Sequence, residues 1–164
     1  AHEDLMKRKK IRPFSEQIYN LRELQLSAYE LYARRHGLTV KEFFVLHILW
    51  FSENGCRQSE ICERLAATKQ TVSAIIKKFL AAGLLTINTS ESDRRNKVIH
   101  LSDKGTAYAE SIILPAMEAE TDALDELSGK EIMELTRLTS IYSKKLKDKF
   151  TVSSDRKAAC DSSD

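Results

Sequence analysis

The sequence contains little of what loop-rich or membrane-spanning proteins need. Its 164 residues include only two prolines and five glycines, too few for a fold dominated by turns and irregular segments, so helix should predominate. No apolar run approaches the roughly 20 residues of a membrane-spanning helix, and the first residues lack the apolar core of a signal peptide. We therefore expect a globular, cytoplasmic protein that does not contact a membrane.

Cysteine is also scarce. Three residues at irregular spacing, Cys56, Cys62 and Cys160, argue against a disulfide framework. The histidines show none of the close spacings typical of zinc ligands, so we expect neither a metal site nor a cofactor. A redox-sensing thiol at Cys56 or Cys62 stays open as an alternative.

Signatures of catalysis are missing as well. The sequence shows no nucleophile beside a base, no glycine-rich phosphate loop and no paired carboxylates at a recognisable spacing. The protein is therefore not expected to be an enzyme.

Charge is small in total but uneven along the chain. The net charge is +2, yet residues 57–97 hold eight basic side chains against four acidic ones. Residues 118–134 reverse this balance, with seven acidic side chains against Lys130 alone. The first region is suited to meet a polyanion such as nucleic acid, and the second would repel it.

Helical spacing of apolar residues begins early in the chain. Residues 1–12 are polar and basic and are expected to be a flexible arm, whereas from Phe14 the apolar positions predict a helix over 13–36 that Gly37 ends. Thr39 and Glu42 form a capping box that starts a second helix. Because this second helix is apolar nearly all round, it should be central and buried.

The next segment predicts a helix-turn-helix. A short helix over 58–66 is followed, after a tight turn, by a helix that Thr68 caps and that runs to Ala82. Its apolar stripe leaves a polar and basic outer face, as in the second helix of a helix-turn-helix. An ordinary helical hairpin with solvated lysines is the alternative reading.

A charged hairpin follows. Residues 84–87 read as a strand, 88–96 as a polar loop and 97–101 as a returning strand. A strand, loop and strand after a helix-turn-helix make a winged helix, so we expect a mainly α fold (α+β winged helix) with a DNA-binding lobe over 55–101. A hairpin tip so rich in charge can bury little and is suited to reach a polyanion.

The remaining helices carry apolar surface in excess. Ser102 caps a helix in which Pro115 makes a kink or a break, and Ser128 with Glu131 opens a last helix toward residue 150, before a tail, 151–164, that is expected to be disordered. The outer helices, 13–36 and 102–150, have more apolar surface than the winged helix between them can cover. Since exposing it costs about 25 cal/mol per Å², these helices of the 13–150 domain are expected to form a two-fold homodimer.

Three segments resemble the MarR family of bacterial transcription regulators. Asp93-Arg-Arg95 followed by Leu101-Ser-Asp-Lys-Gly105 is similar to the family's wing signature. The run TKQTVSAII from Thr68 resembles the start of its recognition helix, and GLTVKEFFVLHIL resembles the approach to its second helix. The chain departs from the pattern at Ser102, where threonine is usual, and at Ala74, where arginine is common.

The resemblance implies roles for the wing and a mode of regulation. Asp93 would pair with Arg95 to brace the wing while an arginine at the tip, for which we favour Arg94, enters the minor groove. Electrostatics supports this role without the resemblance, because a narrow minor groove concentrates negative potential and attracts guanidinium groups. Members of the family mostly repress genes and are released by small phenolic or lipophilic compounds, by oxidation or, in a subgroup, by zinc.

We therefore predict a DNA-binding repressor that binds double-stranded DNA as a homodimer on a pseudo-palindromic operator and responds to an unidentified small-molecule effector. Thr68, at the start of the recognition helix, is a predicted DNA-binding residue, and the predicted major-groove residues follow it: Lys69, Gln70, Thr71, Ser73 and Lys77. Gln70 is the candidate for a bidentate adenine contact. The predicted phosphate contacts are Arg57, Gln58, Ser59, Lys78 and Lys97.

A ligand pocket is a further candidate, between the outer helices and the DNA-binding lobe. Its predicted lining residues are Tyr19, Phe44 and Trp50. The alternatives are a redox sensor that acts through Cys56 or Cys62 and a helical adaptor that uses the winged helix to dock another protein without binding DNA.

Overall fold

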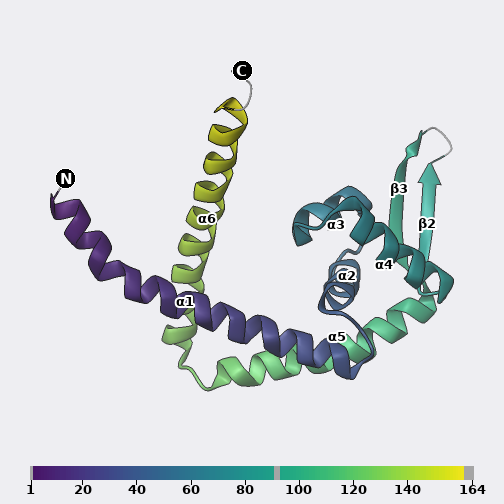
Figure 1. Cartoon of the computed structure of the whole chain (residues 1–164). Helices are drawn as coiled ribbons and strands as arrows, with labels where there is room; N and C mark the ends of the chain where they lie inside the picture. Colours follow the sequence, from purple (N-terminus) through teal and green to yellow (C-terminus); the bar gives the residue numbers. More distant parts are fainter. Residues whose placement is uncertain (1, 91–92, 161–164) are drawn as a thin grey trace. The chain divides into compact units, whose positions relative to one another are not determined.

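The computed structural model describes the backbone of residues 2–90 and 93–160 and the side chains of residues 3–89 and 97–152. It is mainly helical with one small sheet (Figure 1), so the expected α+β winged-helix fold is confirmed. The elements, in chain order, are α1 (His2–Arg35), α2 (Val40–Trp50), β1 (Cys56–Arg57), α3 (Gln58–Leu65), α4 (Lys69–Ala81), β2 (Leu85–Ser90), β3 (Asp93–Leu101), α5 (Asp103–Asp125) and α6 (Gly129–Cys160).

The chain forms two compact units that meet in sequence between Leu114 and Pro115. Pro115 lies inside α5, so the helix is not broken at this proline. The first unit holds the helix-turn-helix and the sheet, and the second consists of the end of α5 and α6. Among the helices that the structure describes, none is both long and apolar enough to cross a membrane.

The two ends of the chain differ from the prediction. The expected flexible arm over 1–12 is helical from His2, and α1 passes through Pro13. Glu3 and Asp4 lie in the first turn, where negative charge stabilises the positive end of the helix dipole. Pro13 removes one helical hydrogen bond and introduces a local clash, at a cost of about 3 kcal/mol or more that the rest of this long helix has to offset. The tail expected to be disordered from residue 151 is helical to Cys160, because no glycine or proline interrupts α6 after Gly129.

Both predicted capping boxes are present. Thr39 Oγ1 accepts the backbone N–H of Glu42 at 3.2 Å, and Glu42 Oε2 accepts the N–H of Thr39 at 3.1 Å. Ser128 and Glu131 make the same exchange at the start of α6, at 3.3 and 2.8 Å. Each box satisfies two backbone donors that the helix itself leaves unpaired.

Helix α2 lies at the centre of the first unit, as predicted. Five of its apolar side chains are buried: Phe43, Val45, Leu46, Ile48 and Leu49. Tyr29 and Tyr32 of α1 pack their rings near Phe43, and the Tyr32 hydroxyl donates to the Ile112 carbonyl of α5 at 2.7 Å. The end of α1 and the first part of α5 are thereby tied together around α2.

The sheet has the strand order β1-β3-β2, with antiparallel pairs throughout. Two corrections apply to the predicted hairpin. The strands extend beyond residues 87 and 97, because Asn88 pairs with Val98 and Thr89 with Lys97 before a register shift at Ser90. The two-residue strand β1, too short to leave a pattern in the sequence, pairs with β3 and fastens the wing to the start of α3.

Candidate nucleic-acid interface

Helices α3 and α4 form the predicted helix-turn-helix. Helix α3 ends at Ala66, whose backbone is left-handed with φ of 47°. Two residues later Thr68 begins α4, and its Oγ1 accepts the N–H of Thr71 at 3.2 Å. The Gln58 side-chain amide donates to the Lys69 carbonyl at 3.3 Å, so the first turns of the two helices are linked directly.

Helix α4 divides into an apolar and a polar side. Its buried residues, three or four positions apart, are Val72, Ile75, Ile76 and Phe79. The predicted reading residues Lys69, Gln70 and Lys77 are exposed, and Ser73 is half-buried. Because Lys69, Ser73 and Lys77 follow at intervals of four, they lie along one side of the helix with Gln70 beside them. We call these four side chains the reading strip.

Thr68 and Thr71, both predicted to contact DNA, also make local hydrogen bonds. Their hydroxyl oxygens lie 2.9 Å apart, and Thr68 already caps the helix. These contacts fix the first turn of α4 and thus the place where the reading strip begins.

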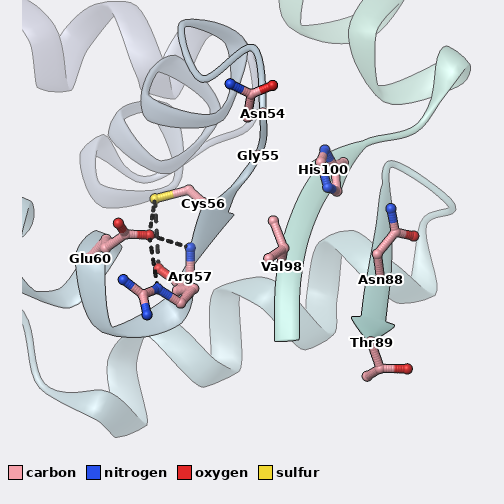
Figure 2. A pocket seen from close by; sticks show the side chains of 9 residues that line it. All are labelled: Asn54, Gly55, Cys56, Arg57, Glu60, Asn88, Thr89, Val98 and His100. Atoms are coloured by element: carbon pink, nitrogen blue, oxygen red, sulfur yellow. Dashed lines mark hydrogen bonds and ion pairs between the residues drawn. The ribbon is translucent and has the colours of Figure 1, made fainter. Parts of the chain in front are cut away.

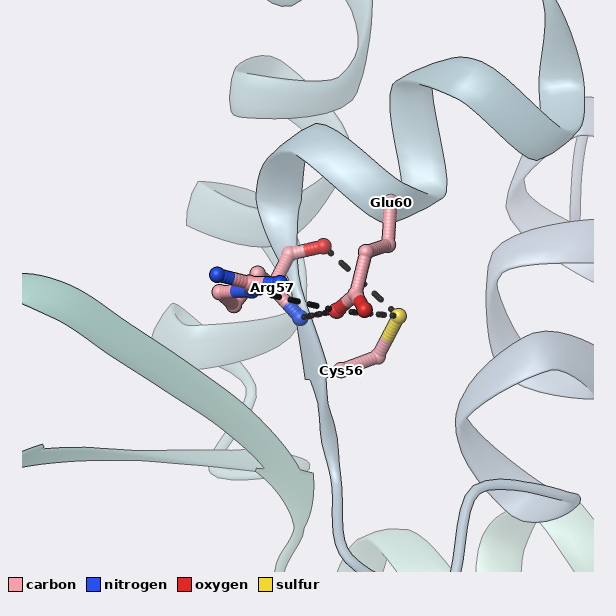
Figure 3. Close-up of polar contacts among 3 residues, drawn as sticks. All are labelled: Cys56, Arg57 and Glu60. Atoms are coloured by element: carbon pink, nitrogen blue, oxygen red, sulfur yellow. Dashed lines mark hydrogen bonds and ion pairs between the residues drawn. The ribbon is translucent and has the colours of Figure 1, made fainter.

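The start of α3 holds the predicted phosphate contacts Arg57, Gln58 and Ser59. The Arg57 N–H donates to Glu60 Oε2 at 2.7 Å, and the Arg57 Nε lies 3.6 Å from the same oxygen. Figure 3 shows these contacts. The hydrogen bond from the Arg57 backbone lowers the pKa of Glu60, and the charge of the arginine lowers it further by a smaller amount. Glu60 is therefore ionised at neutral pH and offsets part of the Arg57 charge, whereas the Ser59 side chain is exposed.

Lys78 of α4 forms an ion pair with α2. Its Nζ lies 2.8 Å from Glu42 Oε1 of α2. Glu42 is only 7% exposed, so this is an ion pair with one buried partner. Sequence reasoning recognised Glu42 only as part of a capping box, because nothing in the sequence relates it to a lysine 36 positions away.

The structure describes the backbone of both wing strands and, at the base of the wing, their side chains. Lys97, a predicted phosphate contact, is exposed on β3 opposite Thr89. Asp93, Arg94 and Arg95 lie in β3, but their side chains are outside the described residues. The predicted brace between Asp93 and Arg95, and the groove contact of Arg94, therefore stay predictions.

The wing joins α5 through a close contact at Gly105. A Cβ atom on this residue would overlap the Leu84 carbonyl. Ser102 Oγ donates to the Gly83 carbonyl at 2.7 Å and accepts the Gly105 N–H at 2.9 Å, and Lys104 Nζ donates to the Ala82 carbonyl at 2.9 Å. The Ser-Asp-Lys-Gly segment thus closes the end of α4 and returns the chain to the outer helix.

A cavity of about 560 Å³ lies at the base of the wing (Figure 2). Its lining residues are Asn54, Gly55, Cys56, Arg57, Glu60, Asn88, Thr89, Val98 and His100. The Cys56 thiol is turned toward Glu60, 3.7 Å from its Oε2. Burial and then the Glu60 charge raise the pKa of Cys56, which keeps this residue a thiol and lowers its reactivity toward oxidants.

The predicted pocket residues each pack against a nearby side chain. The Tyr19 ring lies under the Arg22 guanidinium, Phe44 packs on Tyr29, and Trp50 packs on Phe51. Neither the cavity at the wing base nor a second one of about 640 Å³ beside α4 is lined by Tyr19, Phe44 or Trp50. Within the described part of the chain, no three His, Cys, Asp or Glu residues are grouped so as to hold a metal ion.

Comparison with known proteins gives a consistent result. The sequence model of the MarR family matches residues 36–96. The HTH-type transcriptional regulator MgrA of Staphylococcus aureus is 32% identical over 108 residues, which cover 64% of this chain and 69% of MgrA.

Solved structures share the fold. The MarR family regulator NMB1585 of Neisseria meningitidis superimposes with a TM-score of 0.71 at 23% identity, covering 84% of this chain and 96% of that one. Staphylococcus aureus MarR in complex with salicylate and kanamycin gives a TM-score of 0.69 at 19% identity, covering 84% and 92%.

Proposed function

This chain belongs to the MarR family of DNA-binding transcriptional regulators, and from that premise we propose that it is a homodimeric repressor of a pseudo-palindromic operator. The observation that carries the proposal is the reading strip: Lys69, Gln70, Ser73 and Lys77 lie along α4 outside its buried apolar stripe. A helix with such a polar face fits the major groove of double-stranded DNA.

The strip suits both parts of DNA recognition. The Gln70 amide has the donor and acceptor needed for a bidentate contact to adenine. The Ser73 hydroxyl can hydrogen-bond to a donor or to an acceptor on a base edge. In the part of the chain that the structure describes, the ion pairs do not include Lys69 or Lys77, so their charges are available to DNA. Arg57, Gln58, Ser59 and Lys97 flank the strip as proposed phosphate contacts that position the protein without reading sequence.

The wing adds a minor-groove contact in this proposal. Asp93 holds Arg95 so that Arg94 enters the groove, where a narrow width concentrates negative potential. Replacing Arg94 with Ala should weaken operator binding and leave the melting temperature unchanged. An unaltered affinity would remove the wing tip from the mechanism.

A homodimer is supported by apolar side chains that each unit leaves exposed. On α1, Phe14 and Leu24 are 62% and 66% exposed, and on α6 Met133 is 74% exposed. Leu21 of α1 and Leu138 of α6 continue these exposed faces. A second copy would cover them, and a two-fold dimer would place its two reading strips on half-sites about 34–36 Å apart.

We also propose control by a small molecule. It is supported by the resemblance in fold to a regulator that was solved with salicylate bound. Any effector would have to favour a dimer whose reading strips no longer match the half-site spacing. Tyr19, Phe44 and Trp50 remain proposed lining residues that neither of the two cavities brings together. The redox alternative gains nothing from Cys56, whose thiol is buried and has a raised pKa.

Selection from a library of random DNA duplexes tests the proposal. We expect the full chain to enrich an inverted repeat with half-sites one helical turn apart, and Gln70→Ala to relax the preference at an adenine position by about 1–3 kcal/mol. A chain that enriches no sequence would overturn the proposal and favour the adaptor alternative. The prediction of a cytoplasmic location follows from the proposal, because a regulator must share a compartment with its operator.

A further inference from the structure

We propose that Glu42 is a positioning residue for DNA recognition: its ion pair with Lys78 holds the recognition helix α4 against α2, and Lys78 is a brace rather than a DNA contact. This inference rests on the proposed function and assigns to Lys78 a role different from the phosphate contact that its sequence position suggests. It is carried by the surroundings of the carboxylate, by the side of α4 on which Lys78 lies and by the cavity beside it.

Both oxygens of the Glu42 carboxylate are occupied. Oε2 accepts the Thr39 N–H at 3.1 Å, and Oε1 accepts Lys78 Nζ at 2.8 Å. The residue is 7% exposed, whereas the Lys78 side chain is 55% exposed. Removing the lysine would leave a buried carboxylate without its counter-charge, which is far more costly than breaking a surface pair. The pair is therefore a constraint on the geometry of the two helices.

Lys78 lies on the flank of α4 and not on the reading strip. At about 100° per residue it is rotated by about 80° from Gln70, the nearest residue of the strip, and by about 180° from Lys69 at the far edge. The residues on its own flank are Thr71, Ala74 and Ile75, which line the cavity of about 640 Å³ together with Thr39 and Glu42. The ammonium group points toward α2 because its partner is there.

A cavity adjoins this ion pair, because Glu42 is one of its lining residues. It lies between α4 and the segment that joins α1 to α2, and its further lining residues are Glu30, Arg34, Leu38, Val40 and Lys41. The small residue Ala74 lines the cavity from α4. Apolar packing holds α4 on its buried side, but beside the cavity the Lys78–Glu42 pair spans the two helices. The other two ion pairs described, Arg57–Glu60 and Arg137–Glu134, join residues three apart.

The functional consequence concerns specificity more than affinity. Contacts to base edges require a fixed orientation of the reading strip, whereas contacts to phosphates tolerate small rotations and carry no sequence information. Loosening α4 should therefore weaken binding to the operator and spare binding to unrelated DNA. A lysine that contacts phosphate would behave differently, since its removal weakens both and lowers the salt dependence.

The test compares three single variants of the full chain. Lys78→Met removes the cation, Glu42→Gln removes the buried charge while glutamine keeps the capping box, and Lys97→Met is the matched control at an exposed, proposed phosphate contact. Affinity is measured against a duplex enriched by the wild type and against a random-sequence duplex, each as a function of salt concentration. Circular dichroism and the melting temperature report folding.

We expect Lys78→Met and Glu42→Gln each to lower affinity for the selected duplex roughly tenfold, with little change on the random duplex or in the salt slope. The double variant should be no worse than either single one, because both remove the same coupling. The double variant leaves no unpaired buried charge, because it removes the Glu42 carboxylate together with the Lys78 cation. It therefore tests the proposal even if Lys78→Met folds poorly. Lys97→Met should reduce the slope on both duplexes by about 0.9 for each phosphate that the variant no longer neutralises.

Two results would overturn the inference. If Lys78→Met lowers the salt slope as Lys97→Met does, Lys78 contacts phosphate. If Lys78→Met and Glu42→Gln lower the melting temperature but keep the ratio of the two affinities, the pair stabilises the fold without positioning α4. A wild-type chain that enriches no duplex at all would instead refute the proposed function, so the two failures are distinguishable.

Discussion

At the scale of single residues, Gly105 shows how one position can decide whether the wing and the outer helix meet. A side chain there has no space, since the Leu84 carbonyl occupies the place of its Cβ atom. The same carbonyl accepts the Ser102 N–H at 2.9 Å, so it cannot move without breaking the junction. The glycine is therefore required by a close backbone approach and not by an unusual φ angle.

Replacing Gly105 with Ala should lower the free energy of unfolding by about 3 kcal/mol, because either the Leu84 carbonyl or the first turn of α5 has to shift. Gly129→Ala is the matched control. A Cβ on Gly129 meets nothing within 4 Å, so the same change should be neutral or slightly stabilising. Urea denaturation of the two variants measures both values, and equal effects would contradict the assigned role of Gly105.

At the scale of elements, the features that sequence predicts well are those that neighbouring residues determine. The capping boxes at Thr39 and Ser128, the turn at Gly37 and the apolar stripe of α4 all depend on residues within one or two turns of each other. The partner of Lys78 could not be predicted, because α2 and α4 are brought together only by folding. The strand β1 was missed for the same reason, since two residues become a strand only when β3 pairs with them.

The helix caps also make stability depend on pH. Hydrogen bonds with Ser128 lower the pKa of Glu131 below its ordinary value, and the bond with the Ser128 backbone has the larger effect. A carboxyl group with a lowered folded-state pKa stabilises the fold above its ordinary pKa, and this contribution is lost as the pH falls through the folded-state value. The second unit should therefore lose stability as the medium is acidified below about pH 4.5.

Glu131→Gln should remove that part of the pH dependence, because glutamine keeps the cap but does not titrate. The measurement is urea denaturation of wild type and variant at about pH 6 and at about pH 3, on either side of the ordinary glutamate pKa, where the difference between them should shrink with acidification. Glu118→Gln, a change at an exposed position of α5, serves as the control. A variant that follows the wild-type pH profile throughout would show that the cap charge is not responsible.

At the scale of the whole molecule, the exposed apolar faces of α1 and α6 are the feature that a single chain does not account for. Each lies in its own compact unit, and each exposes large side chains such as Leu24 and Leu138. The sequence predicted an apolar surplus on the outer helices, and the structure agrees. The sequence could not predict how far these helices extend, because a helix end without a strong stop signal depends on contacts outside the local sequence.

Leu24→Glu should convert the proposed dimer to a monomer, since it places a charge within an apolar face that a second copy would cover. Sedimentation equilibrium measures the change in mass, and the variant should keep a cooperative unfolding transition. Ile87→Glu, at an exposed apolar residue of the wing base, should remain dimeric. If Leu24→Glu sediments like the wild type, the face of α1 is not the dimer interface.

The account depends most on the claim that the reading strip and its flanking cations recognise double-stranded DNA. The direct measurement is the binding constant of the full chain for its selected duplex and for a scrambled one, across a range of salt concentrations. We expect both constants to fall steeply with salt, with slopes of about −3.6 or more negative if each protomer makes two phosphate contacts. The selected duplex should bind at least about 10³-fold more tightly than the scrambled one. Binding that ignores salt, or equal affinity for the two duplexes, would contradict the account.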